Sequence, residues 1–198
     1  MVIKGEYVNI KGSKIHYLEI DKESSKDTVI LLHGKRYNAY DWINSGIAEN
    51  LSNQGFKVIC FEFPGYGSSE ECDLEKEEVL LEFVKKLNIS SFHLVAPSFS
   101  GEISIKFALK YGDMLKSLTI VDSINVDKYK EKLNEIYVKT LIVWGKKDEI
   151  APYEFAEILK NNIKNSALFV FENLGHTCYF DDAKKFSEVL INFIKGLN

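Results

Sequence analysis

Residues 92–101 read Phe-His-Leu-Val-Ala-Pro-Ser-Phe-Ser-Gly, and they join an apolar run to a segment of helical character. The run at 92–96 is aliphatic and aromatic, which predicts a strand buried in a sheet. We expect a helix to follow and to extend to about Tyr111. Ser98 therefore lies on the sharp turn between a buried strand and a helix.

A reactive side chain on such a turn places special demands on its neighbours. The backbone is strained there, so the residues two positions before and after the nucleophile must be small. Ala96 and Ser100 meet this requirement, although the usual pattern has glycine at both positions. The motif by itself leaves two interpretations open, because Ser98 is either a nucleophile or a serine that only caps the helix.

Outward from this turn, strands and helices alternate along the chain. The runs at 28–33 and 57–63 are rich in apolar residues and are typical of strands buried on both faces of a parallel sheet. The segments 6–10 and 14–20, joined by Lys11-Gly12-Ser13, predict an antiparallel hairpin at one edge. Further strands are expected at 116–121, 140–144 and 167–171, and helices at 41–53, 73–87, 152–162 and 182–195.

This alternation determines the expected fold class. Strands separated by helices of about 10–15 residues indicate right-handed βαβ crossovers. We therefore predict an α/β fold with a mostly parallel sheet, an N-terminal antiparallel hairpin and helices on both faces. No linker, internal repeat or low-complexity tract interrupts the pattern, so residues 1–198 are predicted to form a single domain.

The composition excludes several classes of function. The chain has 25 basic and 29 acidic residues, a formal net charge of −4, and the two signs are interspersed, which argues against a nucleic-acid binder. No apolar run reaches the roughly 18–20 residues of a membrane span, and the N-terminus lacks the apolar core of a secretory signal. Three scattered cysteines fit reduced thiols better than a disulfide framework, so we expect a cytoplasmic protein.

The sequence also offers little for a cofactor. No pair of Cys or His residues has zinc-ligand spacing, apart from the isolated His176-Thr-Cys178. Gly65-Tyr-Gly67 lacks the third glycine of a dinucleotide-binding loop, and no phosphate-binding loop occurs. We expect neither a metal nor an organic cofactor.

Ligands of an open α/β sheet bind at the carboxyl ends of the strands, so reactive side chains just after predicted strands are the candidates. A serine needs a base to attack at neutral pH. Of the four histidines, only His176 lies on a loop after a late strand at that edge. The acid that orients its imidazole is expected to be Asp148, which follows the strand at 140–144, and Asp122 is the alternative.

Acyl transfer also needs N–H donors for the oxyanion that develops on the carbonyl oxygen. The backbone N–H of Phe99, directly after Ser98, is one expected donor. The second is the N–H of Lys35, on the loop after the strand at 28–33. Ser98, Asp148 and His176, in that chain order, together with these amides would complete a serine hydrolase site.

Five stretches carry a resemblance to the α/β-hydrolase superfamily across essentially the whole chain. They are Leu31-Leu-His-Gly34, Phe63-Pro-Gly-Tyr-Gly-Ser-Ser69, the turn at Ser98, Gly145-Lys-Lys-Asp148 and Leu174-Gly-His176. Within the superfamily the chain most resembles the small, lidless α/β-hydrolase-domain-containing protein 14 family. Its S-P-S-x-S-G, H-G-x-R and G-H-x-C-Y-x-D segments correspond to Ala96-Pro-Ser-Phe-Ser-Gly101, His33-Gly-Lys-Arg36 and Gly175-His-Thr-Cys-Tyr-Phe-Asp181. Ala96 departs from that pattern, as does Glu62, where an aspartate is usual.

The resemblance implies a triad of Ser98, Asp148 and His176 and hydrolysis of simple acyl esters, with deacylation of acetylated amines as an associated activity. A serine in this position excludes the haloalkane dehalogenase variant, which needs an aspartate nucleophile. Many relatives insert a helical lid where this chain has only 122–139, enough for one short helix near 128–136. An open site without a lid is therefore predicted.

Several alternatives stay open. The fold could serve a non-catalytic binding or adaptor protein, because fold does not determine function, and the same triad would also suit a thioesterase or deacylase. We expect a small-molecule acyl substrate and no nucleic-acid or membrane partner, and the sequence names no protein partner. Lys35 and Arg36 either attract an acidic substrate or form a solvated basic loop, and Cys178 is either a structural thiol or a redox-sensitive one. Candidate pocket residues are Arg36, Tyr37 and Tyr179, with further aromatics at Tyr40, Trp42 and Phe180.

Overall fold

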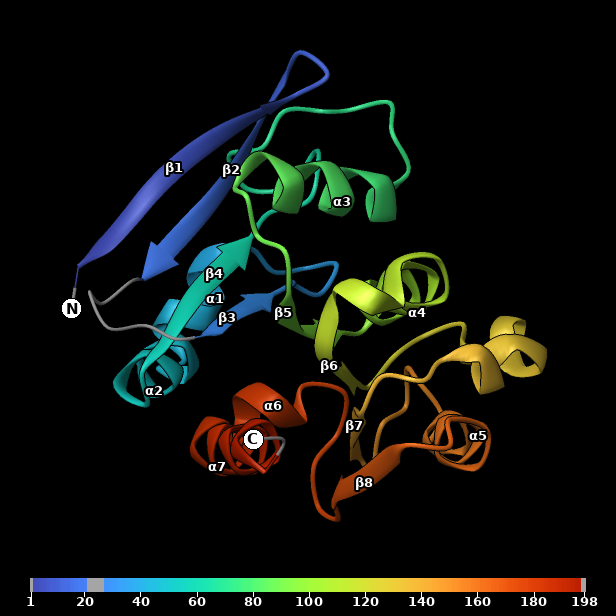
Figure 1. Ribbon diagram of the computed structural model, residues 1–198. Coiled ribbons are helices and arrows are strands. Elements are labelled where there is room, and N and C mark those ends of the chain that lie inside the picture. The colour runs from blue at the N-terminus through green and yellow to red at the C-terminus, as the bar shows by residue number, and fades with distance from the viewer. Residues whose placement is uncertain (1, 21–26, 197–198) are drawn as a thin grey trace.

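The computed structural model describes residues 2–20 and 27–196. Its strands are β1 (Ile3–Ile10), β2 (Ser13–Ile20), β3 (Asp27–Leu31), β4 (Phe56–Phe61), β5 (Phe92–Pro97), β6 (Leu115–Val121), β7 (Thr140–Gly145) and β8 (Ser166–Phe171). They form one sheet in the order β1-β2-β4-β3-β5-β6-β7-β8 (Figure 1). The pairs from β4-β3 to β7-β8 are parallel, whereas β1-β2 and β2-β4 are antiparallel. The predicted sheet, with an antiparallel hairpin at its N-terminal edge, is confirmed.

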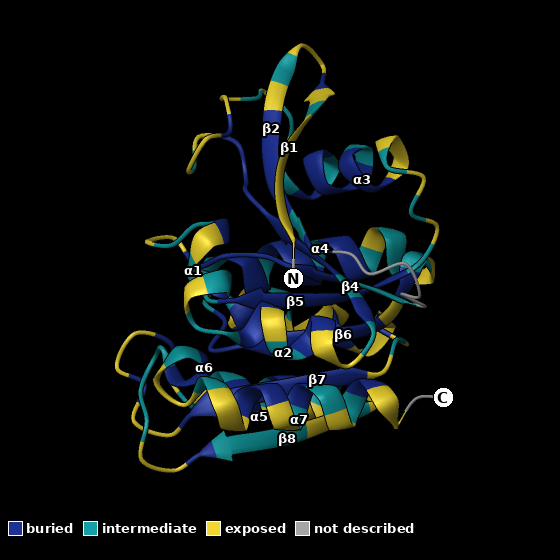
Figure 2. Cartoon of the chain, turned by 90° about the vertical axis from the view of Figure 1, so that its left-hand side faces the viewer, coloured by how far each residue is buried: buried dark blue, intermediate teal, exposed yellow. Residues whose placement is uncertain are grey.

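Helices cover both faces of this sheet, as predicted. They are α1 (Ala39–Asn44), α2 (Ile47–Asn53), α3 (Lys76–Lys86), α4 (Phe99–Tyr111), α5 (Glu154–Asn162), α6 (Cys178–Asp181) and α7 (Ala183–Lys195), with 3-10 helices η1 (Gly112–Met114) and η2 (Val126–Glu135). Helices α1, α2 and α7 lie on one face, and α3, α4 and α5 lie on the other (Figure 1). Between them the central strands are buried, whereas exposed residues lie on the outer sides of the helices, along β1 and in the loops (Figure 2).

Two hydrophobic cores lie on the two faces of the sheet, because successive side chains of a strand point in opposite directions. In β3, Val29 and Leu31 pack into the core under α1, α2 and α7, whereas Ile30 packs into the core under α3, α4 and α5. In β7, Val143 and Trp144 divide between the two cores in the same way. Strands buried on both sides explain why these segments are continuous apolar runs rather than alternating ones.

The helix predicted over 41–53 is instead two helices. Gly46 separates them with a φ of 77°, a left-handed conformation that glycine adopts without steric cost. The first helix also begins earlier than predicted, because Asn38 is its N-cap and accepts a hydrogen bond from the Tyr40 amide. Asp41 is the third helical residue and accepts from the Asn38 amide, which completes a capping box.

The helix predicted from Asp73 begins later, at Lys76. Leu74 packs against the core before the helix starts, and the first amides of the helix, on Glu78 and Val79, donate to the Glu75 carbonyl. A polar residue ahead of an apolar pattern predicted the cap. Because Leu74 packs against the core, the first turn of α3 begins after this residue, at Lys76.

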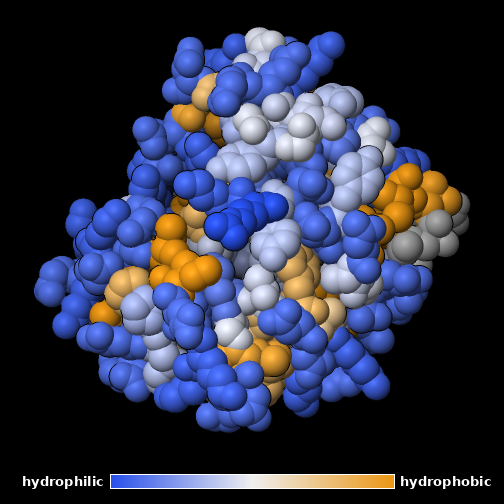
Figure 3. Space-filling view, turned by 180° about the vertical axis from the view of Figure 1, so that it is seen from behind, coloured by the Kyte–Doolittle hydropathy of each residue, from blue (hydrophilic) through white to orange (hydrophobic). Residues whose placement is uncertain are grey.

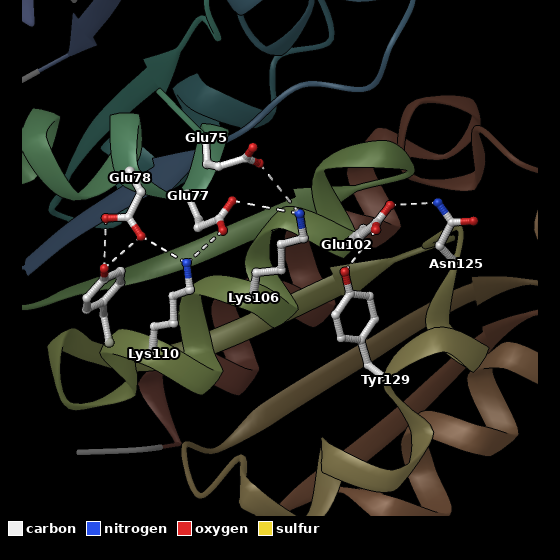
Figure 4. A network of polar contacts seen from close by, with 9 residues as sticks. Glu75, Glu77, Glu78, Glu102, Lys106, Lys110, Asn125 and Tyr129 are labelled. Atoms are coloured by element: carbon white, nitrogen blue, oxygen red, sulfur yellow. Dashed lines mark hydrogen bonds and ion pairs between the residues drawn. The ribbon is translucent and has the colours of Figure 1, made fainter. Parts of the chain in front are cut away.

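The segment between β6 and β7 holds only η2, and no separate lid domain is present in the described part of the chain. Figure 4 shows how this segment is attached to α4: the Glu102 carboxylate accepts hydrogen bonds from Asn125 Nδ2 at 2.6 Å and from the Tyr129 hydroxyl at 2.9 Å. The predicted short helix is thus a 3-10 helix joined to its neighbour by two side-chain hydrogen bonds. The prediction of a lidless fold is confirmed.

The surface carries no broad apolar face on the side shown in Figure 3, where the hydrophobic side chains of the described residues form small patches among hydrophilic ones. None of the helices within 2–20 and 27–196 is long and apolar enough to span a membrane. Of the large hydrophobic side chains that are most exposed, three lie on or directly before β1 and the others on α1 and in loops: Val2, Ile3, Tyr7, Tyr40, Tyr137 and Ile150.

Candidate active site

Ser98 occupies the turn between β5 and α4 in a strained conformation. Its φ is 56° and its ψ is −122°, a region that side-chain-bearing residues rarely adopt and that costs about 1–3 kcal/mol. Backbone hydrogen bonds hold the turn, since the Ser98 amide donates to the Val121 carbonyl at 2.8 Å and the Gly101 amide donates to the Ser98 carbonyl at 3.0 Å. Strain maintained in this way keeps the hydroxyl at the carboxyl edge of the sheet.

The small residues around Ser98 are needed for packing, as the sequence predicts. Ala96 and Ser100 are both fully buried, and the Ser100 hydroxyl donates to the Pro97 carbonyl at 2.7 Å. Gly101 is also obligatory, because a Cβ there would overlap the side chain of Ser123 and lie 3.2 Å from its Cα. The start of α4 therefore packs directly against the loop after β6.

A chain of hydrogen bonds links three of the predicted residues. The Ser98 Oγ lies 2.8 Å from His176 Nε2, and His176 Nδ1 lies 2.8 Å from Asp148 Oδ2. The other carboxylate oxygen, Asp148 Oδ1, accepts from the amides of Ile150 at 2.8 Å and Ala151 at 2.9 Å. Since the carboxylate accepts at Nδ1, that nitrogen carries the imidazole proton and Nε2 is free to accept from the serine hydroxyl.

Two opposing effects act on the pKa of His176. Burial lowers it, while the hydrogen bond to Asp148 and the charges of Asp148 and Asp122 raise it by more, so the pKa lies above its ordinary value. The imidazolium form is therefore stabilised at this position. A base of this kind suits a reaction in which the histidine gains a proton and later returns it.

Asp122, the alternative acid, makes other contacts. Its φ is 44°, and its carboxylate accepts from the Gly145 amide at 2.8 Å and from the Cys178 thiol at 3.1 Å. No hydrogen bond joins it to His176 within the described residues. Burial raises the pKa of Asp122 to about 7. The hydrogen-bonded acid is thus Asp148, and Asp122 lies beneath it as a buried neighbour.

Cys178 is fully buried beside that carboxyl. Burial, together with the charge of Asp122, raises the pKa of the thiol far above its usual range, so it stays protonated and acts as a hydrogen-bond donor. This environment favours the structural interpretation of Cys178 over the redox-sensitive one.

The loop after β3 lies against Ser98. A Cβ placed on Gly34 would lie 3.7 Å from the Ser98 Cβ, which shows how closely the two backbones approach. His33 shapes this loop: its Nδ1 donates to the Gly34 carbonyl at 2.9 Å, and its Nε2 accepts from the Phe63 amide at 3.1 Å. Burial lowers the pKa of His33, which keeps it neutral in this role.

The two amides predicted as oxyanion donors are available for a ligand. Neither the Lys35 N–H nor the Phe99 N–H donates a hydrogen bond to any described residue. Both residues line the cavity that contains Ser98. The arrangement can therefore present two N–H donors beside a serine hydroxyl.

That cavity has a volume of about 410 Å³ and contains all three candidate pocket residues. Tyr40, Trp42 and Phe180 are not part of its wall, and the Trp42 indole instead donates to the Leu32 carbonyl at 3.0 Å. Ile124 and Ile150 were not predicted, although each stands two residues beyond an aspartate in the loop after a strand. The full lining consists of Gly34, Lys35, Arg36, Tyr37, Ser98, Phe99, Ile124, Ile150, His176, Thr177 and Tyr179.

A second cavity of about 440 Å³ adjoins the first and shares Lys35, Phe99 and Ile124 with it. Its remaining wall comes from α3, α4 and the residues before them, and includes the carboxylates of Glu75, Glu77 and Glu102. As for metal ions, the described residues contain no group of three His, Cys, Asp or Glu side chains placed to hold one.

Comparison with known proteins agrees with this architecture. A family model described as alpha/beta hydrolase fold matches residues 27–129, and one described as TAP-like protein matches residues 121–195. Among curated proteins, "Protein ABHD14A" of Homo sapiens is 28% identical over 194 residues, which cover 94% of this chain and 71% of that protein. "Putative protein-lysine deacylase ABHD14B" of Homo sapiens is 27% identical over 201 residues, covering 96% and 94% of the two chains.

Solved structures share the fold. A crystal structure titled a predicted CIB-like hydrolase from Thermoplasma acidophilum superposes with a TM-score of 0.94 at 23% identity, covering 99% of each chain. The esterase EaEST from Exiguobacterium antarcticum superposes with a TM-score of 0.84 at 22% identity, covering 97% of this chain and 100% of that one. The sheet order, the strained serine turn and the family match lead to one conclusion: this chain belongs to the α/β-hydrolase fold family.

Proposed function

We propose that this chain is a serine hydrolase that cleaves small or exposed acyl esters through an acyl-enzyme. The observation that carries the proposal is the hydrogen-bonded series from Ser98 Oγ through both imidazole nitrogens of His176 to the Asp148 carboxylate. The hydroxyl of a serine is a weak nucleophile, and a base at this distance can take its proton as it attacks. Relatives with hydrolase names support the same general activity.

In the acylation step, His176 Nε2 takes the proton of Ser98 as Oγ bonds to the carbonyl carbon of the substrate. The electron pair of the carbonyl double bond moves to its oxygen, and the amides of Lys35 and Phe99 donate to this oxyanion. Asp148 stabilises the imidazolium. When the carbonyl re-forms, the bond to the leaving alcohol breaks, and His176 gives its proton to that alcohol.

Deacylation repeats these steps with water as the nucleophile. His176 takes a proton from the water while the oxygen bonds to the acyl carbon, and the same two amides hold the second oxyanion. Collapse breaks the bond to Ser98 Oγ, which regains its proton from His176 and releases the carboxylic acid. Each oxyanion donor is expected to contribute about 100-fold to 1,000-fold to the rate.

Ser98→Ala tests the proposal. We expect the variant to lose hydrolysis of 4-nitrophenyl acetate and covalent labelling by a fluorophosphonate probe, while thermal unfolding shows that it remains folded. Ser90→Ala, which removes an exposed hydroxyl after α3, is the matched control and should retain both. The proposal is falsified if Ser98→Ala retains wild-type turnover and labelling.

Deacylation of an acylated amine is the second candidate, because a relative that aligns with 96% of this chain is named as a protein-lysine deacylase. The same steps apply with an amine as the leaving group, which His176 must protonate before the C–N bond breaks. Turnover of an acetyl-lysine peptide and of a matched thioester, each compared with an ester, would rank these activities. Absent labelling together with saturable binding of a protein would instead favour a non-catalytic binding role.

The proposal places the protein in the cytoplasm. All three cysteines are free thiols, and Cys60 and Cys178 are fully buried. Unpaired thiols are usual in a reducing compartment. Labelling of all three with a thiol reagent after denaturation of protein taken from cells would test this part of the proposal.

A further inference from the structure

The cavity at Ser98 has an unusual charge pattern. Lys35 and Arg36 line it, and no carboxylate is among its lining residues. Arg36 is also the only arginine of the chain, whose other basic residues are all lysines. A guanidinium differs from an ammonium in offering a planar set of donors that matches a carboxylate in two hydrogen bonds.

Both cations are free to meet a ligand. Neither Lys35 nor Arg36 forms an ion pair with any residue of the described chain. The carboxylates near the rim accept from neutral donors and form no ion pair with Lys35 or Arg36: Asp41 accepts from the Asn38 amide at 2.7 Å, and Asp181 accepts from the Thr177 hydroxyl at 3.0 Å. Asp148 is buried beneath His176. The cavity therefore presents positive charge without an internal counter-ion.

A buried hydroxyl adds a second, independent observation. Tyr179 is only 1% exposed but is one of the residues that line the cavity, and its hydroxyl is hydrogen-bonded to none of the described residues. A Cβ built on Gly34 would lie 3.4 Å from this oxygen, so the hydroxyl stands beside the loop that carries Lys35 and Arg36. Burial raises the pKa of Tyr179 far above its usual value, which keeps the phenol protonated and able to donate. A donor in a cavity wall that no protein group accepts from is available to a ligand.

We propose that the substrate of this site carries a carboxylate near its scissile carbonyl, bound by Arg36 with support from Lys35 and the Tyr179 hydroxyl. The inference rests on the proposed function, since it takes the ligand to be an ester hydrolysed at Ser98. It goes further by assigning a substrate class, an anionic ester. The carboxylate can belong to the acyl group, as in a half-ester of a short dicarboxylic acid, or to the leaving alcohol.

The preference for an anionic substrate is expected to come from the Ser98 cavity and not from the overall charge of the chain. The chain as a whole has a net charge of −4, and the adjoining cavity is lined by three glutamates and three lysines, so neither of them favours an anion. A gain from negative charge on the substrate must then come from the Ser98 cavity itself. It should weaken as salt screens the charges.

Two matched pairs of esters test the proposal. On the acyl side, mono-4-nitrophenyl glutarate is compared with 4-nitrophenyl pentanoate, and on the alcohol side, 4-acetoxybenzoate is compared with its methyl ester. We expect wild-type kcat/KM to be about tenfold higher for the anionic member of one pair, the effect of one well-formed charged hydrogen-bond pair. The pair that shows the preference identifies which end of the substrate meets Arg36.

Variants assign the preference to residues. Arg36→Gln should lower the anionic-to-neutral ratio by about tenfold, and Tyr179→Phe, which keeps the aromatic packing, by about threefold. Lys4→Gln removes one positive charge from an exposed position on β1 and should leave the ratio unchanged. Equal ratios for anionic and neutral members in both pairs would overturn the proposal. So would a ratio unaffected by Arg36→Gln, or one lowered equally by Lys4→Gln.

A binding measurement separates this inference from the proposed function. In the Ser98→Ala background, monomethyl glutarate should bind more tightly than dimethyl glutarate by calorimetry, and Arg36→Gln should abolish the difference. If wild type turns over no ester but this difference is present, the catalytic proposal fails and the anion site stands. If esters are hydrolysed without any anionic preference and the two glutarates bind equally, the anion site fails and the catalytic proposal stands.

Discussion

The imidazole of His176 lies between a serine hydroxyl and a carboxylate, each 2.8 Å from one of its nitrogens. Burial lowers its pKa, and Asp148, through a hydrogen bond and its charge, raises it by more. If His176 is the base, activity requires its neutral form. The activity of the wild type should therefore fall as pH decreases through a value above the ordinary imidazole pKa of about 6.5.

Asp148→Asn should change both the rate and its pH dependence. Loss of the carboxylate removes the main effect that raises the pKa of His176, so the acid limb of kcat/KM should move to lower pH. The rate itself should fall by about 10,000-fold, because an amide no longer stabilises the imidazolium or the productive tautomer. The measurement is kcat/KM for a short ester from pH 5 to 9. Asp113→Asn, an exposed control, should match wild type, and an unmoved acid limb in Asp148→Asn would contradict the assignment.

Asp122 gives a second pH effect, on stability rather than on rate. Burial raises its pKa from 3.8 to about 7, so the folded state holds a proton that the unfolded state has lost over this interval. The stability that this proton contributes is fully present below pH 3.8 and is lost as pH rises toward 7. Between pH 5 and 8 the loss attributable to Asp122 is on the order of 2 kcal/mol.

Asp122→Asn should reduce this dependence. The free energy of unfolding, measured by urea titration at pH 5 and pH 8, should decline less in the variant than in wild type. The comparison between the two proteins isolates the contribution of this carboxyl from that of the other titrating groups. Asp113→Asn serves again as the control, and an equal decline in Asp122→Asn and wild type would show that Asp122 titrates in its ordinary range.

At the scale of elements, the end of β7 and the loop before α6 approach each other closely. The Lys147 amide donates to the Leu174 carbonyl at 2.9 Å. A Cβ on Gly145 would lie 2.7 Å from the Leu174 carbonyl oxygen and would overlap that of Gly175. This contact joins the element that carries Asp148 to the loop that carries His176.

Gly145→Ala should therefore affect activity more than stability. The added methyl group must push the loop of His176 away from β7, and misplacement by about 1 Å can cost on the order of 100-fold in rate. The expected overpacking penalty is about 1–3 kcal/mol, which leaves the fold in place. Gly112→Ala, where a Cβ would meet nothing within 4 Å, is the matched control. Equal kcat/KM for both variants would show that this contact does not position the histidine.

At the scale of the whole molecule, the short connection between β6 and β7 leaves the Ser98 cavity without a covering domain in the described chain. Two hydrogen bonds to Glu102 join η2 to α4 beside the cavity (Figure 4). The hydrophobic groups on the face shown in Figure 3 form small patches rather than a broad lipid-binding surface. This architecture favours substrates that are small or that present their acyl group in solution.

The dependence of rate on acyl chain length should reflect this openness. Along a series of 4-nitrophenyl esters, kcat/KM should be highest for short acyl chains and fall toward dodecanoate, because a cavity of about 410 Å³ open to solvent offers no tunnel for the distal methylenes. Activity should rise smoothly through the critical micelle concentration of the ester, without the increase that lid opening produces. A rate that keeps rising out to long-chain esters would contradict the open-site description.

Local patterns in the sequence determined much of the fold and part of the site. Apolar runs mark β3 to β7 because both faces of a parallel sheet are buried, and small residues around Ser98 reveal the turn because its backbone tolerates nothing larger. The split at Gly46 and the late start of α3 were less predictable, since glycine conformation and the packing of Leu74 depend on the surrounding core.

Tertiary structure alone decided which acid faces the histidine. Asp122 and Asp148 both follow strands, and because β6 and β7 are neighbours, their carboxylates end beside the same imidazole. The local sequence does not distinguish the two aspartates. In the structure, Asp148 accepts a hydrogen bond from His176, whereas Asp122 accepts from Gly145 and Cys178. The absence of carboxylates from the lining around Arg36 is likewise a property of loops brought together from separate strands. A sequence specifies its own turns and buried runs, whereas the chemistry of a cavity depends on which distant segments the sheet order places side by side.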